Sequence, residues 1–203
     1  ALKVGADLTQ KANVVVSEIL DSGLLGEGVL PSLRDAKANL LTQKATIIPK
    51  SAEVYGILIE SPHLKSVHPL QEICGFDLSP FDELREKTPY KRVLLNQVPH
   101  QRLSDVFPIQ NFDFYNLPSY YSEHNPLKKT IKVKASKAGQ VHAVAFWFTL
   151  HLDNEISLSS GPKGEMIHWG QALCFLNEVK NVKEGEEIEI TMNQSDMSIW
   201  FTI

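Results

Sequence analysis

The sequence predicts a mainly β protein, a β-barrel or β-sandwich, preceded by a short α/β segment. Three observations lead to this fold class. Strand-patterned segments follow one another from residue 45 almost to Ile203. Before them, only Ser32 to Leu41 has helical spacing, and an apolar β-branched run occupies Val14 to Val16. Many strands with few helices are typical of barrels and sandwiches.

Length and composition narrow the classes of protein. The chain has 203 residues, enough for one large or two small domains. Its formal net charge of -4 argues against a broad basic face, so we expect no direct nucleic-acid partner and no membrane partner. No apolar run approaches the roughly 20 residues of a membrane span, and no signal peptide is recognisable. We interpret Cys74 and Cys174 as reduced core thiols, which favours a soluble protein of the cytoplasm, the nucleus or both.

The first predicted element is the strand Val14 to Val16. Its lack of polar alternation is typical of a strand buried on both faces of a parallel sheet. The chain starts Ala1-Leu2-Lys3 without an initiating Met, and the few residues before the strand leave no room for a partner. We therefore expect a fragment of a larger α/β protein.

The next predicted element is a helix from Ser32 to Leu41. Its apolar residues have the i, i+3, i+7, i+8 spacing of one helix face, and Pro31 and Ser32 are start signals. From there on we predict strands, with Gly139 as a hairpin turn and Glu184 to Glu186 as a second turn. The predicted strands are 46–48, 52–60, 106–114, 129–135, 141–152, 166–176, 187–192 and 197–203.

Three carboxylates follow the first predicted strand. Glu18 and Glu27 lie nine residues apart, on either side of a glycine- and leucine-rich loop that also holds Asp21. Two anions in a semi-enclosed site are costly unless a cation pairs with them, and the planar fork of a guanidinium matches carboxylate geometry. The local pattern alone favours a solvated acidic loop over such a site.

With these residues the chain resembles the protein arginine methyltransferase family. Ser17-Glu18 after an apolar strand, with Glu27 nine positions later, resembles that family's double-glutamate loop. Ile167-His168-Trp169 resembles its threonine-histidine-tryptophan loop, although Ile167 stands where the family has threonine. The resemblance continues through Gly75-Phe76-Asp77 and the closing Trp200 to Ile203.

The resemblance implies a division into two parts. Residues 1–44 would be the end of a Rossmann-like S-adenosylmethionine-dependent methyltransferase domain, and residues 45–203 a β-barrel substrate-binding domain. The family's glycine-rich cofactor turn would lie upstream, so the resemblance places S-adenosylmethionine in the full-length protein and no cofactor-binding residue in this chain. An insertion at about 76–103 occupies the place of the family's dimerisation arm, and within it only Asp82 to Lys87 has a helical pattern.

The resemblance also implies site residues. Glu18 and Glu27 would be catalytic, and Asp21, His168 and Trp169 would bind substrate. Without the acidic loop, a His-Trp pair on a strand would be read as ordinary packing. The scattered histidines offer no matched ligand set, so we expect no metal site.

The amino-acid sequence of the loop favours a divergent branch of that family. Asp21, Gly26-Glu27-Gly28 and Leu95 to Val98 resemble type III enzymes, which make monomethylarginine, and the loop also resembles the symmetric-dimethylating ninth mammalian member. We therefore expect arginine-rich protein or peptide substrates and monomethylation. The competing interpretations are symmetric dimethylation, or a non-catalytic barrel that binds arginine-rich peptides. The full-length protein would be dimeric or carry tandem modules, whereas this fragment would be monomeric and inactive.

Overall fold

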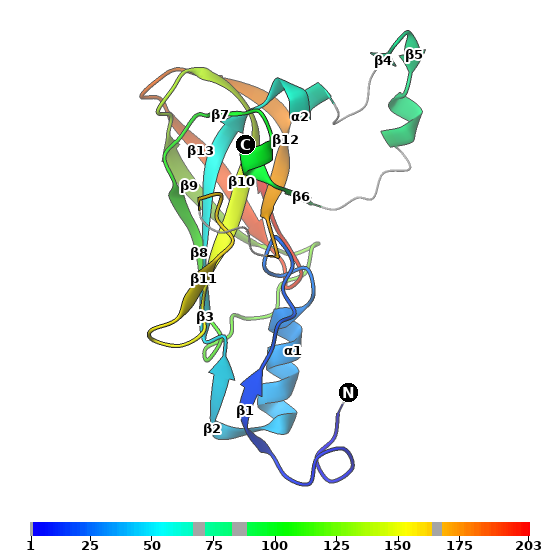
Figure 1. The fold of residues 1–203 in the computed structure, drawn as a ribbon, viewed down its shortest axis with the longest axis vertical. Coiled ribbons are helices and arrows are strands. Elements are labelled where there is room, and N and C mark those ends of the chain that lie inside the picture. Colours follow the sequence, from blue (N-terminus) through cyan, green and yellow to red (C-terminus); the bar gives the residue numbers. More distant parts are fainter. Residues whose placement is uncertain (1, 67–71, 83–88, 164–167) are drawn as a thin grey trace.

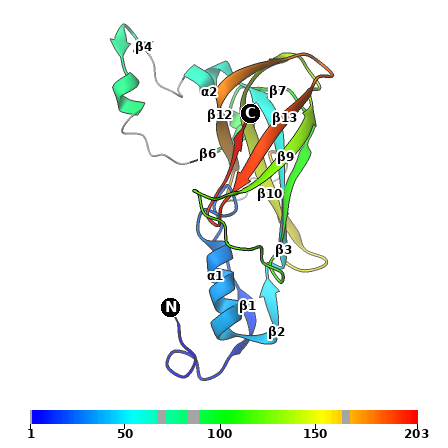
Figure 2. The same ribbon diagram turned by 180° about the vertical axis from the view of Figure 1, so that it is seen from behind.

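The computed structural model describes residues 2–66, 72–82, 89–163 and 168–203, and within them the protein is mainly β (Figure 1). A barrel-like body of curved strands forms one end of an elongated molecule, and α1, β1 and β2 form the other end (Figures 1 and 2). The predicted fold class is confirmed. None of the helices in these ranges is long and apolar enough to cross a membrane.

The helices and short strands connect the longer strands. The helical elements are α1 (Val29–Asp35), a π-helix (Ala36–Leu40), α2 (Pro62–Ser66) and two 3₁₀ turns (Ser79–Asp82 and Leu95–Gln97). The strands are β1 (Ala12–Val16), β2 (Leu41–Ile48), β3 (Ser51–Glu60), β4 (Glu72–Ile73), β5 (Phe76–Asp77), β6 (Lys91–Val93), β7 (Gln101–Arg102), β8 (Phe107–Asp113), β9 (Leu127–Lys134), β10 (Gly139–His151), β11 (Ser157–Ser159), β12 (Gln171–Val182), β13 (Glu187–Gln194) and β14 (Ile199–Thr202).

Two sheets make up the barrel-like body. The larger sheet has the order β6-β12-β10-β3-β7, with β11 added to β10 and β8 added to β3. The smaller sheet has the order β14-β13-β9. The sheets are joined through their edges and their core: the backbone N–H of Phe201 in β14 donates to Cys174 Sγ in β12, and the ring of Phe201 packs edge-on against Phe146 of β10 at 5.4 Å.

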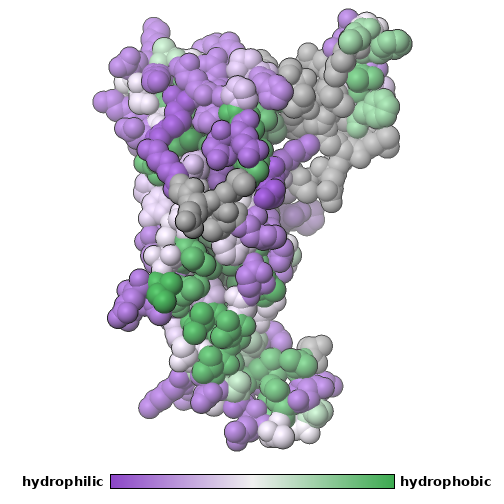
Figure 3. All heavy atoms as spheres, in the orientation of Figure 1, coloured by the Kyte–Doolittle hydropathy of each residue, from purple (hydrophilic) through white to green (hydrophobic). Residues whose placement is uncertain are grey.

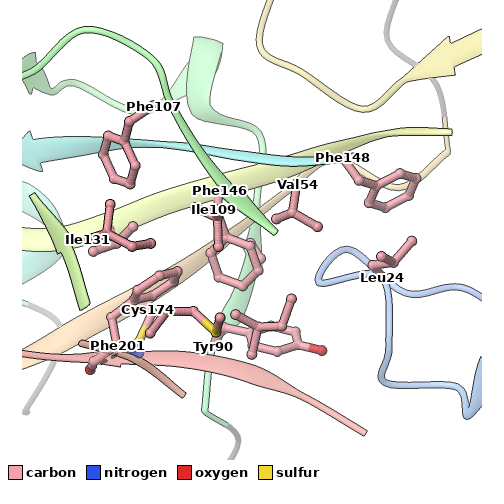
Figure 4. Close-up of a cluster of buried hydrophobic side chains, with 14 of the residues drawn as sticks. Leu24, Val54, Tyr90, Phe107, Ile109, Ile131, Phe146, Phe148, Cys174 and Phe201 are labelled. Carbon is pink, nitrogen blue, oxygen red and sulfur yellow. Dashed lines mark hydrogen bonds between the residues drawn. The ribbon is translucent and has the colours of Figure 1, made fainter. Parts of the chain in front are cut away.

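The core of the barrel-like body also encloses part of the predicted acidic loop. Leu24 and Leu25 of the loop, with Leu30 and Leu33 of α1, are fully or almost fully buried and belong to the same hydrophobic cluster as Phe146. Figure 4 shows Leu24 and Phe146 within this cluster. Burying a leucine side chain stabilises a fold by roughly 1.5 to 3 kcal/mol. The loop is therefore held against the barrel by its own apolar side chains.

The first strand differs from its prediction. β1 pairs in parallel with β2, a strand later in the chain, so the missing partner is supplied from downstream. Val14 and Val16 are 48% and 71% exposed, instead of buried on both faces. The reason is that β2 is the only strand that pairs with β1 among the described residues. Figure 3 shows apolar residues at the surface of this end of the molecule.

Other predicted elements also need correction. The helix begins three residues earlier than predicted, at Val29, and changes to a π-helix at Ala36. Gly139 is no hairpin turn, because β9 and β10 belong to different sheets; it starts β10, where a Cβ would lie 2.3 Å from the Glu60 carboxylate. Cys174 is a buried free thiol as predicted, but Cys74 is exposed, in the turn between β4 and β5.

The remaining predicted strands appear with shifted ends, and the turn around Gly185 is present. β12 begins at Gln171 instead of residue 166. The predicted helical stretch reaches the described residues only at Asp82, which ends a 3₁₀ turn. Its remaining residues 83–87, together with Met166 and Ile167, lie outside the described part of the chain.

Candidate functional site

The acidic loop is organised around the carboxylate of Asp21. Its Oδ1 accepts the backbone N–H groups of Gly23 at 3.1 Å and Gly26 at 2.9 Å, and Oδ2 accepts the hydroxyl of Tyr90 at 2.7 Å. Both oxygens are thus engaged within the protein. Asp21, predicted to bind substrate, lines the pocket but first of all fixes the shape of the loop.

Two glycines of the loop allow Tyr90 and Asp21 to approach its backbone closely. A Cβ on Gly23 would lie 2.2 Å from the ring of Tyr90, and one on Gly26 would lie 2.5 Å from Asp21 Oδ2. Both positions are therefore filled by neighbouring side chains and do not form an open cradle for a ligand. Gly23 and Gly26 thus do not fit a glycine cradle for S-adenosylmethionine, and the absence of cofactor contacts from this chain stays a prediction.

Glu18 is joined to the barrel by Trp169. The indole Nε1–H of Trp169 is shared between Glu18 Oε1 at 3.1 Å and the carbonyl oxygen of Leu20 at 2.8 Å. The indole is buried and packs edge-on against Phe148 at 5.2 Å. The two sequence motifs, which lie about 150 residues apart in the chain, are therefore in direct contact.

A pocket of about 730 Å³ lies beside this contact. Four of the five predicted site residues line it, namely Asp21, Glu27, His168 and Trp169. Glu18 does not line it and contacts only its wall, through the hydrogen bond from Trp169. Glu27 is exposed, and its carboxylate has no hydrogen bond or ion pair with any residue that the structure describes. The arrangement leaves a carboxylate at the pocket that can pair with an incoming cation.

Tyr90 is a pocket residue that sequence reasoning missed. Its side chain is 9% exposed and packs edge-on against Phe146 at 5.4 Å (Figure 4). Burial raises the pKa of its hydroxyl far above the usual range, and the charge of Asp21 and the hydrogen bond to it act in the same direction. Tyr90 therefore stays protonated and donates to Asp21.

Arg92 is the second missed residue. Its Nε donates to the carbonyl oxygen of Trp169 at 2.8 Å, and a terminal nitrogen donates to that of His168 at 3.0 Å. The guanidinium thus holds the backbone of the His168–Trp169 pair. The ring of His168 is exposed at the pocket, and among the described residues it makes no hydrogen bond. The described residues contain no group of three or more His, Cys, Asp or Glu that could hold a metal ion.

Comparisons with known proteins show which family the chain is similar to. Residues 50–203 match the family model of the arginine methyltransferase oligomerization subdomain. The chain is 32% identical to an arginine N(ω)-methyltransferase of Streptomyces achromogenes subsp. streptozoticus, with 100% of this chain and 55% of that protein covered. It is 31% identical to protein arginine N-methyltransferase 7 of Oryza sativa subsp. indica, covering 100% of this chain and 32% of the relative.

Two more distant relatives extend the comparison. Human protein arginine N-methyltransferase 9 is 27% identical over 96% of this chain and 26% of its own length. A solved structure, the Trypanosoma brucei PRMT1 enzyme-prozyme heterotetrameric complex with AdoHcy, shares the fold with a TM-score of 0.71 at 21% identity, over 95% of this chain and 59% of that chain.

The chain matches only part of each relative's length. It spans about half of the Streptomyces relative and about a third of the rice relative. The family model covers three quarters of this chain, from the end of the β2–β3 connection to Ile203. The chain therefore belongs to the arginine methyltransferase family.

Proposed function

We propose that this chain is the substrate-binding part of a protein arginine methyltransferase. The full-length protein would transfer a methyl group from S-adenosylmethionine to a terminal guanidinium nitrogen of arginine in protein substrates. Residues 1–44 would close the methyltransferase domain, and residues 45–203 would form the barrel that covers the substrate. S-adenosylmethionine would supply the methyl group from a site outside this chain, so the chain by itself would be inactive.

One observation carries the proposal. The Glu18–Trp169 hydrogen bond joins the acidic loop to the barrel beside a pocket that Glu27 also faces. A guanidinium has five N–H donors in a planar fork and pairs with carboxylates through two parallel hydrogen bonds. A pocket lined by the unpaired carboxylate of Glu27, with Glu18 held against its wall by Trp169, suits this cation better than a neutral ligand.

The proposed roles follow from these contacts. Glu18 and Glu27 would hold the guanidinium between them, orient the reacting nitrogen and localise its electron density, which is catalysis by positioning and electrostatics. His168 and Trp169 would line the entry of the arginine side chain. Asp21 would contribute negative charge to the pocket while it shapes the loop.

We further propose that the product is monomethylarginine. Asp21 and Glu27 both line the pocket, and this negative charge favours the unmethylated guanidinium, which has more N–H donors than the methylated one. Symmetric dimethylarginine is the alternative product.

The test is a methyl-transfer reaction with the full-length protein, S-adenosylmethionine and an arginine-rich peptide, run to completion and read by fragmentation mass spectrometry. We expect monomethylarginine as the dominant product. Dominant symmetric dimethylarginine would refute monomethylation and support the alternative, and asymmetric dimethylarginine would refute both. Peptide binding without transfer would identify a non-catalytic module.

A second candidate substrate is free arginine. The Streptomyces relative matches all of this chain, although the match covers only 55% of the relative. Its name gives arginine itself as the substrate. The same reaction with free arginine in place of the peptide decides between them, because a protein methyltransferase will prefer the peptide by kcat/KM.

The family model suggests what assembles with the chain. It is that of an oligomerization subdomain, so we propose that the full-length protein forms a dimer or a pair of tandem modules. We also propose that it acts in the cytoplasm, the nucleus or both.

A further inference from the structure

The pocket wall has two halves, the acidic loop and the His168–Trp169 pair, and strand β6 with the preceding Tyr90 contacts both. Residues Arg92 and Val93 of β6 pair with Ala172 and Gln171 at the start of β12, which only Gly170 separates from the His168–Trp169 pair. Tyr90 immediately precedes the strand, and Tyr90, Lys91 and Arg92 all line the pocket.

Tyr90 reaches one half of the pocket, the acidic loop. Its hydroxyl donates to Asp21 Oδ2, while Asp21 Oδ1 accepts two backbone N–H groups of the loop. Its ring fills the space above Gly23, where any side chain would collide with it. Tyr90 therefore restrains the loop both by a hydrogen bond and by packing.

Arg92 reaches the other half. Its two donor groups hold the consecutive carbonyl oxygens of His168 and Trp169. Directly after them, Gly170 has a φ of 68°, and a Cβ there would lie 2.9 Å from the carbonyl oxygen of Val93. The turn that presents His168 and Trp169 is thus built against β6.

We propose that Tyr90 and Arg92 are positioning residues, which act from one short strand to fix the two halves of the site relative to each other. Tyr90 acts through Asp21 on the loop that carries Glu18 and Glu27. Arg92 acts through backbone carbonyls on His168 and Trp169. The catalytic consequence rests on the proposed function, whereas the structural coupling does not.

The experiment compares Tyr90→Phe with Tyr55→Phe in the full-length protein. Tyr55 is a matched control, because its hydroxyl also donates to a carboxylate, Glu53, at 2.7 Å, but it does not line the pocket. Tyr90→Phe keeps the ring and removes only the donor. We expect hydrogen exchange of the Gly23 and Gly26 amides to accelerate about tenfold or more in Tyr90→Phe, and to be unchanged in Tyr55→Phe.

Kinetics separate positioning from general structural support. Misplacement of a catalytic group by about 1 Å can cost roughly 100-fold in rate, so we expect kcat of Tyr90→Phe to fall about 10- to 100-fold with little change in KM. In an Asp21→Ala background, Tyr90→Phe should add no further loss, because the residue acts through Asp21. An additive loss in that background would overturn the route through Asp21.

A second pair of variants tests the other half. Arg92→Lys keeps the charge but loses the fork that spans two carbonyl oxygens, so exchange at residues 168–170 should accelerate. Arg102→Lys is the control, since Arg102 donates to a single carbonyl oxygen, that of Ser104, and does not line the pocket. Should Tyr90→Phe fold poorly, the exchange data for Arg92→Lys still decide the proposal for the second half.

The outcomes are distinct from those of the proposed function. Unchanged exchange of Gly23 and Gly26 in Tyr90→Phe, or of residues 168–170 in Arg92→Lys, would overturn the positioning role. Accelerated exchange in a protein whose wild type methylates neither peptide nor free arginine would support the positioning role while the proposed function fails.

Discussion

Arg34 in α1 and Asp196 in the turn between β13 and β14 form a two-pronged ion pair, with one guanidinium nitrogen 2.8 Å from Asp196 Oδ1 and the other bonded to Oδ2. The Asp196 side chain is only 5% exposed. The next two residues, Met197 and Ser198, line the pocket. The pair therefore fastens the helix that follows the acidic loop to a turn of the barrel at the edge of the site.

The first prediction concerns this ion pair. Asp196→Asn removes one partner of a largely buried pair, which costs about 3 kcal/mol because the guanidinium loses its counter-charge. Urea unfolding would show this as a lower midpoint with an unchanged slope. Lys132→Met is the control: Lys132 pairs with Glu187 and Glu189 at the exposed surface, so its loss should change the midpoint little. Equal effects of the two variants would contradict the role given to Arg34 and Asp196.

The second prediction is a loss of stability at alkaline pH caused by Cys174. Burial raises the pKa of this thiol to about 11, and the hydrogen bond from Phe201 offsets only part of that shift. A raised folded-state pKa means that stability is full below the unfolded value, near 9, and falls as the pH rises through 11. The loss across that window is about 3 kcal/mol.

The matched control for this prediction is the exposed thiol. Cys174→Ala should flatten the fall of the unfolding free energy between pH 9 and 11, whereas Cys74→Ala should leave it unchanged. A profile that stays the same in Cys174→Ala would show that another group controls alkaline unfolding.

The third prediction concerns the contact between loop and barrel. Trp169→Phe keeps an aromatic ring against Phe148 but removes the N–H that holds Glu18 Oε1 and the Leu20 carbonyl. Losing a hydrogen bond to a charged group should lower kcat/KM of the full-length enzyme about tenfold or more. Trp147→Phe, in a second hydrophobic cluster, is the control and should keep near wild-type rates. Equal rates for both variants would refute a functional role for the Trp169–Glu18 contact.

The fourth prediction concerns residues 1–203 on their own. Because Tyr90 and Asp21 fill the space at Gly23 and Gly26, and the family resemblance places the cofactor turn outside this piece, it should not bind S-adenosylmethionine measurably. Isothermal titration calorimetry tests this, and micromolar affinity would show that the cofactor site has been misplaced. Light scattering should find a monomer, and a stable symmetric dimer joined through residues 76–103 would contradict that expectation.

The sequence predicted those parts of the fold that depend on local pattern. β3, β9 and β10 have the alternating or continuous apolar character of strands, and they occur close to their predicted bounds. Glu18, Glu27, His168 and Trp169 are predicted as site residues because their spacing resembles two motifs of one family. The structure adds that these motifs touch, which the spacing alone could not establish.

Features that depend on contacts distant in the chain were missed. Tyr90 binds Asp21 across 69 residues, and Arg92 binds Trp169 across 77. Neither belongs to a periodic pattern, and both lie within the proline-rich segment Pro62 to Pro126, whose sequence predicts irregular connections around short strands. The prediction of a turn at Gly139 was wrong for a similar reason. This position requires a residue without a Cβ because Glu60 and Leu103 fill the space there, not because the chain turns.

The most direct test of the central claim is the rate of the full-length enzyme with Glu27→Gln and Glu18→Gln, measured with an arginine-rich peptide and S-adenosylmethionine. A neutral amide keeps the shape of the side chain but cannot pair with a guanidinium cation, so kcat/KM should fall by orders of magnitude in each variant while the fold remains intact. Asp21→Asn should have a smaller effect. Near wild-type rates in either glutamine variant would contradict the account and would support the alternative interpretation of the segment as a solvated acidic loop.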